Sequence, residues 1–272
     1  MDARLQRRVQ RYGWDRAVEV YDRYWREQLE PAQSRMMEMA AVRPGERVLD
    51  VACGTGLVTF RAAEACGPAG EVVGTDISQK MVDDAAAEAA RRGIDHARFE
   101  RMDAEDLRLP DARFDVALCG LGLMYLPDPE AGLREMSRVL VTGGRVAAAV
   151  WGQRTRCGWA EIFPIVDARV ESDVCPLFFQ LGAADSLERA FVAAGLTEVR
   201  SERLSTTLHY ESDEAACGAA FVGGPVALAH AHLDEKTRSE AYAEYLASIA
   251  PFRNGHGYDI PGEFVVARGV SR

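Results

Sequence analysis

Between residues 47 and 151 the sequence alternates between short apolar runs and segments whose apolar residues recur at helical spacing. The apolar runs predict buried strands, and the intervening segments, at about ten to fifteen residues, suit crossover helices. Such alternation favours a parallel sheet covered on both faces, which is a doubly wound α/β fold. The predicted strands are 47–52, 71–76, 97–103, 114–120 and 145–151, and the predicted helices are 57–66, 79–92 and about 129–140.

The flanking segments follow other patterns. Residues 4–40 predict helices, with Pro31 at the start of a second one, and we expect them to form a lid over the core. After Trp151 the sequence predicts, in order, a helix at 186–196, a strand at 197–210, a helical stretch at about 212–250 and a strand at 262–269. The two late strands predict an antiparallel hairpin at the edge of the sheet.

With this hairpin the prediction becomes a Rossmann-like, seven-stranded sheet with an N-terminal helical lid and a helical insertion near the C-terminus. The expected divisions are a lid (1–42), an α/β core (43–210), a helical insertion over the substrate side (211–257) and a final edge strand (258–272).

The composition of the chain excludes several kinds of binding partner. The formal net charge of −10 argues against nucleic acid, because phosphate contacts need clustered Lys and Arg. The one dense basic run, Arg4 to Arg11, suits a solvated helix face. The six cysteines form no C-x-x-C pair and lie at no zinc-finger spacing, so we expect no metal site, no disulfide framework and a reducing, cytoplasmic compartment. No signal-peptide core is evident, and no apolar run approaches the ~18 residues of a membrane span.

The segment D-V-A-C-G-T-G (residues 50–56, the glycine loop) follows the first predicted strand. A dinucleotide fingerprint needs G-x-G-x-x-G, and neither register of this loop supplies the third glycine. A Walker A loop needs a lysine that is absent here. The loop therefore predicts close approach of a nucleotide-like ligand that carries no pyrophosphate.

Acidic residues stand at the ends of the next two predicted strands. Asp76 lies about twenty residues after the glycine loop, where a carboxylate accepts hydrogen bonds from both hydroxyls of a ribose. Asp103, followed by Ala104, is placed to accept a bond from an adenine amino group. Met81 suits packing on the adenine ring, although a methionine at this spacing also suits plain core. Together these residues predict an adenosine site.

With these motifs the sequence resembles the class I S-adenosylmethionine-dependent methyltransferases, and in particular their UbiE/COQ5-type small-molecule branch. The resemblance is strong over about residues 44–151, and its motifs agree in order and spacing. They are VLDVACGTG (48–56), VVGTDIS (72–78), ERMDAEDLRLPDARFDVALC (100–119) and EMSRVLVTGGRVAAAVW (135–151).

The resemblance implies S-adenosyl-L-methionine as cofactor and a role for each matching residue. Gly54, Thr55 and Gly56 would pass close to the methionyl part, with Ala52 where the family often has glycine and Asp50 orienting the loop or the ammonium group. Asp76 would bind the ribose, and Ile77 and Met81 would surround the adenine. The remaining cofactor contacts would be Asp103 and Ala104 at the adenine edge and Cys119 near the methionyl chain.

The expected reaction is methyl transfer to a small, partly apolar organic acceptor, secondary-metabolite-like or quinone-like, chiefly through positioning. Tyr125 lies in the loop after the fourth strand and is a candidate base, although an aromatic packed under the next helix also fits. His209 is a second candidate among several late histidines, each of which also suits a surface or core position. Tyr21 is a candidate lid contact to the cofactor, although an aromatic at this spacing also suits core.

Two alternatives stay open from the residues alone. One is an NAD-dependent oxidoreductase, and the other is an S-adenosylmethionine-binding protein without catalysis. The methylated atom, the use of a general base and homodimer formation also stay open.

Overall fold

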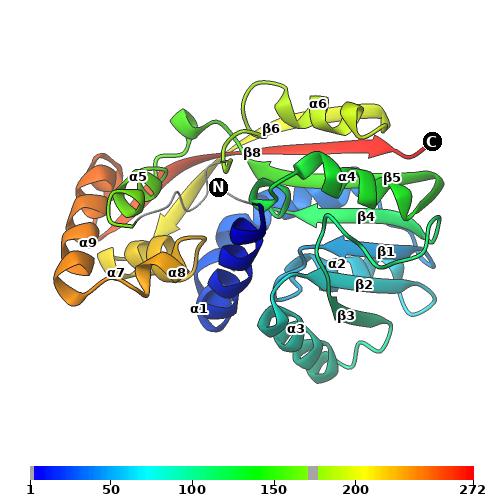
Figure 1. Ribbon diagram of the computed structural model, residues 1–272, viewed down its shortest axis with the longest axis horizontal. Helices are drawn as coiled ribbons and strands as arrows, with labels where there is room; N and C mark the ends of the chain where they lie inside the picture. The colour runs from blue at the N-terminus through cyan, green and yellow to red at the C-terminus, as the bar shows by residue number, and fades with distance from the viewer. Residues whose placement is uncertain (1–2, 171–176) are drawn as a thin grey trace.

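The computed structural model describes residues 3–170 and 177–272 (Figure 1). Its strands are β1 (Arg47–Val51), β2 (Glu71–Asp76), β3 (Ala97–Arg101), β4 (Phe114–Gly120), β5 (Leu140–Trp151), β6 (Thr197–Tyr210), β7 (Arg253–Asn254) and β8 (Gly257–Val270). Its α-helices are α1 (Ala3–Ala40), α2 (Leu57–Cys66), α3 (Gln79–Arg92), α4 (Pro129–Arg138), α5 (Ile162–Asp167), α6 (Ser186–Ala193), α7 (Asp213–Cys217), α8 (Ala227–His230) and α9 (Glu235–Ile249). Shorter turns are η1 (Leu123–Tyr125), η2 (Arg154–Arg156), η3 (Gly218–Val222) and η4 (Ala250–Phe252).

The strands form one sheet in the order β3-β2-β1-β4-β5-β8-β6, with β7 paired to β8 off this path. Strands β1 to β5 pair in parallel, as the alternating pattern predicts. Local signals fix several boundaries: the Ser78 side chain caps the start of α3, and Gly93 ends it in the left-handed conformation. The chain reverses its winding direction at β1 and β4, which is where α/β sheets bind their ligands.

The two late strands are antiparallel to each other, as predicted, but the position of the last one differs from the prediction. Strand β8 pairs with β5 on one side and β6 on the other, so β6 and not the C-terminal strand forms the edge. Only Phe264–Val270 of β8 pairs with β5, because the first half of β8 runs beyond β5 with β6 alongside. Figure 1 shows this extension supporting α7, α8 and α9.

Helix α1 is continuous through Pro31, where the sequence predicts a break between two helices. Proline removes one backbone hydrogen bond inside a helix. Here Leu29, Ala32 and Met36, on both sides of the proline, are buried in the core, and this packing holds the helix together. Helix α1 packs against α3, α8, β5 and β8, and in Figure 1 it lies between the sheet and the helices of the insertion.

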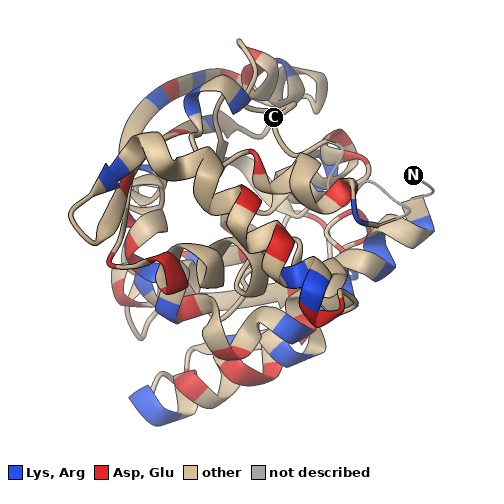
Figure 2. Ribbon diagram, turned by 90° about the vertical axis from the view of Figure 1, so that its left-hand side faces the viewer, with Lys and Arg blue, Asp and Glu red and all other residues tan. Residues whose placement is uncertain are grey.

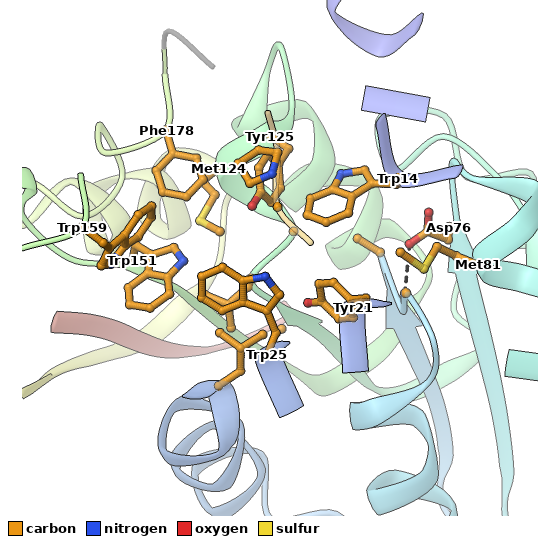
Figure 3. Close-up of a pocket in the computed structure, with 18 residues that line it drawn as sticks. Trp14, Tyr21, Trp25, Asp76, Met81, Met124, Tyr125, Trp151, Trp159 and Phe178 are labelled. Carbon is orange, nitrogen blue, oxygen red and sulfur yellow. Dashed lines mark hydrogen bonds between the residues drawn. The ribbon is translucent and has the colours of Figure 1, made fainter. Parts of the chain in front are cut away.

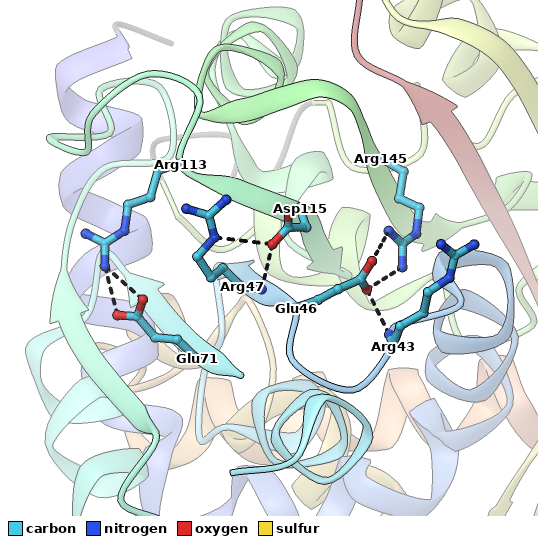
Figure 4. A network of polar contacts seen from close by, with 7 residues as sticks. All are labelled: Arg43, Glu46, Arg47, Glu71, Arg113, Asp115 and Arg145. Carbon is cyan, nitrogen blue, oxygen red and sulfur yellow. Dashed lines mark hydrogen bonds and ion pairs between the residues drawn. The ribbon is translucent and has the colours of Figure 1, made fainter. Parts of the chain in front are cut away.

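An ion-pair network holds the amino ends of the parallel strands (Figure 4). At its centre Glu46 pairs with Arg145 at 2.7 Å, and both side chains are mostly buried. The Arg145 guanidinium also donates to the carbonyls of Ala40 and Ala41, which lie at the C-terminal end of α1. Neighbouring pairs join Arg47 to Asp115 and Arg113 to Glu71. These contacts hold the amino ends of the strands and the C-terminal end of α1 in place. The carboxyl ends of the strands, on the opposite side, are left for ligands.

In the described ranges no helix is both long enough and apolar enough to cross a membrane. The cysteines at 53, 66, 119, 157 and 217 are free and buried, and Cys175 lies outside the described residues.

Candidate active site

A cavity opens at the carboxyl ends of β1, β2, β4 and β5 (Figure 3). Its walls come from the glycine loop, the loop after β4, α1, and the segment that follows β5. The lining side chains and backbone belong to Trp14, Tyr21, Trp25, Leu29, Ala52, Gly54, Asp76, Met81, Gly120, Leu121, Gly122, Met124, Tyr125, Trp151, Trp159, Phe178, Gly224 and Pro225.

The glycine loop turns sharply to reach this cavity. Ala52, Gly54 and Gly56 all have positive φ, of 56°, 54° and 91°. This conformation explains why glycine suits position 52 and why alanine there is strained. A Cβ built on Gly54 meets nothing within 4 Å, so this side of the loop is open to the cavity. A Cβ on Gly56 would lie 2.7 Å from the ring of Phe60, which excludes a side chain there.

Asp50 supports the loop from behind and does not line the cavity. Its Oδ2 accepts a hydrogen bond from the Thr59 hydroxyl at 2.6 Å, and its buried Oδ1 has no partner. Burial raises the pKa of Asp50 to about 7. Thr59 was not among the predicted residues, although its place one turn into α2 puts it opposite the end of β1.

Asp76 lies at the end of β2 and reaches both the main cavity and a smaller hollow beside it. Its carboxylate accepts hydrogen bonds from the backbone N–H of Gly54 at 2.9 Å and of Ser78 at 2.8 Å. Burial raises its pKa to about 6, partly offset by these two donors. A carboxylate accepts about four hydrogen bonds, so lone pairs remain for the hydroxyls of a ligand.

The smaller hollow contains the residues predicted at the adenine. Ile77, Asp103 and Ala104 line it together with Asp76 and Met102. Met81 lines the main cavity instead.

Asp103 already has protein partners at both carboxylate oxygens. Its Oδ1 accepts from the backbone of Glu105 at 3.0 Å, and its Oδ2 pairs with Arg7 of α1 at 2.9 Å. A ligand amino group at this edge would therefore share Oδ2 with Arg7 or displace it.

Helix α1 closes the open side of the cavity through polar contacts to each neighbouring loop. Asp22 accepts from the hydroxyl of Thr55, and Asp15 accepts from that of Ser78. Gln6 donates to the backbone carbonyl of Tyr125, and Arg7 pairs with Asp103 as described above. Thr55 therefore contacts α1 and does not line the cavity.

Basic residues gather near the N-terminus (Figure 2). Arg7, Arg8 and Arg11, from the basic run of the sequence, line a surface hollow with Arg101 and Arg108. Arg8 is exposed, as expected of a solvated helix face, whereas Arg7 pairs with Asp103.

The end of the main cavity away from Asp76 is aromatic. Trp25, Trp151 and Trp159 meet edge to face, with ring centroids 4.8 to 6.3 Å apart. Phe178 lies against Trp159 at 5.7 Å and against Tyr125 at 5.4 Å. Such arrangements are favourable for aromatic pairs and form firm walls.

Of these wall residues, only Tyr125 was predicted from the sequence as a candidate site residue, in the loop after the fourth strand. Trp14, Trp151, Trp159 and Phe178 were missed as site residues. Trp151 is the last residue of β5. Its position at the carboxyl end of a parallel strand is the sequence signal that could have identified it as a site residue.

The two tyrosine candidates both line the cavity. The hydroxyl of Tyr21 points into it in Figure 3, and burial, with the charges of Asp22 and Asp76, raises the pKa of this phenol. The ring of Tyr125 meets Trp14 and Phe178 edge to face. At neutral pH Tyr21 is a hydrogen-bonding group and not a base.

Besides Asp50 and Thr55, three further predicted residues lie off the main cavity and the smaller hollow. His209 is on the exposed part of β6, where its Nδ1 pairs with Asp259 at 2.6 Å, and it borders a separate hollow near Gln28. Cys119 is buried behind Gly122, and burial raises its thiol pKa to about 12. Gly56 caps the start of α2. The structure therefore does not bring His209 to the cavity as a base.

Among the residues that the structure describes, no group of three or more His, Cys, Asp or Glu has a metal-binding arrangement.

Comparisons with known proteins agree with this geometry. Residues 48–144 match the methyltransferase domain family. Nocamycin O-methyltransferase of Saccharothrix syringae is 31% identical over 229 residues, which cover 78% of this chain and 80% of that protein. The chain belongs to the class I S-adenosylmethionine-dependent methyltransferases.

Two further proteins are similar to this methyltransferase. A demethylmenaquinone methyltransferase of Staphylococcus aureus is 32% identical over 186 residues, covering 62% of this chain and 75% of that protein. The crystal structure of the YcgJ protein from Bacillus subtilis has a TM-score of 0.61 at 20% identity and covers 89% of this chain and 99% of that one, which shows the shared fold. The resemblance stated from the motifs is thus confirmed, and the oxidoreductase alternative has no support.

The residues of this methyltransferase fit the family's cofactor. The open side of Gly54 allows close approach to backbone, and the buried carboxylate of Asp76 lies between the main cavity and the hollow at Asp103. Trp14, Ala52, Gly122 and Tyr125 line both spaces, so one elongated ligand can extend from one into the other.

Proposed function

We propose that the chain transfers a methyl group from S-adenosylmethionine to a small, flat, mostly apolar acceptor. The observation that carries the proposal is the shape of the main cavity, which extends from the Asp76 carboxylate to the aromatic wall of Trp25, Trp151 and Trp159. A protein that only bound the cofactor would not need this apolar space beyond it.

In this proposal the adenosine part lies in the hollow of Ile77, Asp103 and Ala104, with its ribose hydroxyls on Asp76. The methionyl part lies along Gly54 and Gly122. When bound, the cofactor supplies an activated methyl group on a sulfonium. The aromatic wall would hold the acceptor in line with that methyl, and positioning of this kind can lower a barrier by ~7–11 kcal/mol.

The charged groups around the cavity limit the charge that the acceptor can carry. Among its described lining residues there is no Lys, Arg or His, and the titratable ones are Asp76, Tyr21 and Tyr125. A phosphorylated acceptor would have no cation to pair with, and burial of an unpaired charge is costly. A neutral or singly ionised acceptor is therefore favoured.

Calorimetric titration tests the cofactor part of the proposal. S-adenosylmethionine is expected to bind the purified chain, whereas NAD is not. Asp76→Ala is expected to weaken the binding of S-adenosylmethionine ~10- to 100-fold, because the ribose hydroxyls lose their acceptor. A matched control is Asp259→Ala, since Asp259 is exposed and pairs with His209 away from the cavity. Equal affinities for Asp76→Ala and the unchanged chain would remove Asp76 from the site.

A further inference from the structure

Five arginines line one surface hollow between α1 and the carboxyl end of β3. This hollow shares Ile77, Met102 and Asp103 with the smaller hollow described above, and it shares no lining residue with the main cavity. We call it the arginine hollow. Its arginines are Arg7, Arg8 and Arg11 from α1, Arg101 from the end of β3 and Arg108 from the loop that follows β3.

Only one of these arginines has a carboxylate partner within the described ranges. Arg7 pairs with Asp103 and with Glu105. The carboxylate of Asp103, the one acidic group among the described lining residues, is already bound by Arg7 and by the backbone of Glu105. The other four guanidinium groups form no ion pair in the part of the chain that the structure describes; they belong to Arg8, Arg11, Arg101 and Arg108.

A group of unpaired arginines is unexpected in this chain, which has 42 acidic residues and 32 basic ones. At the amino ends of the strands, Arg47, Arg113 and Arg145 each meet a carboxylate. In the arginine hollow, positive charges on α1 face positive charges on the core, and like charges repel each other. A bound anion would replace this repulsion with attraction on both sides.

Phosphate is the anion that this group of side chains suits best. A guanidinium group is planar and can donate two parallel hydrogen bonds to the oxygens of one phosphate. One phosphate group carries a charge of about −1.5 to −2 at pH 7, so four unpaired guanidinium groups match two or more phosphates. A nucleic acid is disfavoured, because it needs an extended basic surface and the net charge of this chain is −10.

We propose that the arginine hollow binds a small ligand with two or more linked phosphate groups, and that this ligand fastens α1 to the core. Arg8 and Arg11 bind it from α1. Arg101 and Arg108 bind it from the core. The proposal does not depend on the proposed function, because the arginine hollow lies outside the main cavity.

Tripolyphosphate is the probe, and it is titrated calorimetrically into the full chain without cofactor. It is expected to bind at least ~10-fold more tightly than inorganic phosphate, because it reaches more of the arginines. Arg11→Gln and Arg101→Gln remove one guanidinium from each side of the hollow, and each is expected to weaken tripolyphosphate ~10-fold. The matched control is Arg200→Gln, since Arg200 is exposed on β6, away from the hollow, and its loss is expected to change the affinity less than ~2-fold.

Hydrogen exchange tests whether the ligand fastens α1. Saturating tripolyphosphate is expected to slow the exchange of backbone amides in residues 5–14 at least ~5-fold, because detachment of this part of α1 then requires loss of the ligand contacts. Potassium chloride at the same ionic strength is the control and is expected to leave these rates unchanged. Circular dichroism of each variant checks that it is folded.

Three results would overturn the proposal. The first is no binding of tripolyphosphate to the unchanged chain, and the second is an equal loss of affinity in Arg200→Gln and in the two variants of the hollow. The third is unchanged exchange of α1 at saturation. Vesicles of phosphatidylcholine and phosphatidylglycerol are a further arm, and binding to them without binding of tripolyphosphate would assign the arginines to a membrane surface and reject the small ligand.

Discussion

The hydroxyl of Thr55, in the glycine loop, donates a hydrogen bond of 2.5 Å to the carboxylate of Asp22 on α1. The bond joins α1 directly to the loop that carries Gly54. Asp15 makes a similar bond to Ser78 at the start of α3. We therefore expect the release of a cofactor to require that α1 break polar contacts with the loops around the site.

Asp22→Ala should speed the dissociation of S-adenosylhomocysteine about 5- to 10-fold, because the net free energy of one hydrogen bond is about 1 kcal/mol. Stopped-flow tryptophan fluorescence with competitor chase measures this rate. Arg26→Ala is the control, since it removes the exposed pair between Arg26 and Asp22 and leaves the bond to Thr55. Equal rates for the Asp22→Ala variant and the unchanged chain would show that α1 does not limit release.

Binding of the cofactor should depend on pH through Asp76. The ribose hydroxyls need an ionised acceptor, and burial raises the pKa of this carboxyl to about 6 in the free chain. Affinity for S-adenosylhomocysteine should therefore rise up to ~10-fold per unit from pH 5 to 6 and level off above pH 7.

Asp76→Asn should bind more weakly at pH 7 and show a flatter profile. The same raised pKa has the opposite effect on the stability of the free chain. A group whose pKa is raised in the fold is best accommodated when protonated, so its stability contribution is complete below about pH 4 and is lost as the pH rises through about 6. Chemical denaturation at pH 5 and 7, in both proteins, checks that sign.

Arg145→Met should lower the free energy of unfolding by about 3 kcal/mol. The change leaves Glu46 mostly buried without its partner and removes the donors to the carbonyls of Ala40 and Ala41. Urea denaturation followed by circular dichroism measures the loss. The exposed pair between Arg154 and Glu161 serves as the control, and Arg154→Met should cost under about 1 kcal/mol. Similar losses in both variants would contradict the role given to Arg145.

Ala52→Gly should stabilise the free chain by about 0.5–1 kcal/mol, because a left-handed conformation costs alanine more than glycine. At position 52 φ is 56°. The same substitution at exposed Ala86, inside α3, should instead destabilise by about 1 kcal/mol. Thermal unfolding measures the change in melting temperature of each variant. A lower melting temperature for Ala52→Gly would show that the backbone at Ala52 is not strained.

Elements with a strong local pattern were predicted to the residue. Strand β2 follows its apolar run, and α3 begins at the capping Ser78 and ends before Gly93. The prediction failed where distant contacts decide the outcome. Pro31 stays inside α1 because residues on both sides are buried in the core, and β8 lies inside the sheet because β6 pairs with its outer side.

The residues of the site also divide into those that the sequence predicts and those that only the fold brings together. Asp76 and Gly54 follow strand ends, so the sequence pattern alone brings them together. Trp25, Trp159 and Phe178 come from three separate segments, and each reads as core until the fold places them around one space. No spacing in the sequence relates residue 14 to residue 178, and only the packing of α1 over the sheet brings them to the same cavity.

The two ends of α1 differ in how they are held. Met36, Ala40 and Arg145 fix the C-terminal end, whereas hydrogen bonds and an ion pair from Gln6, Arg7, Asp15 and Asp22 hold the part over the cavity. Because Ala17 and Trp25 in this part of the helix are also buried, its detachment would expose apolar surface as well as break these polar contacts. If this detachment limits the rate of product release, the turnover number of the enzyme would depend on the contacts of α1 as well as on the rate of methyl transfer.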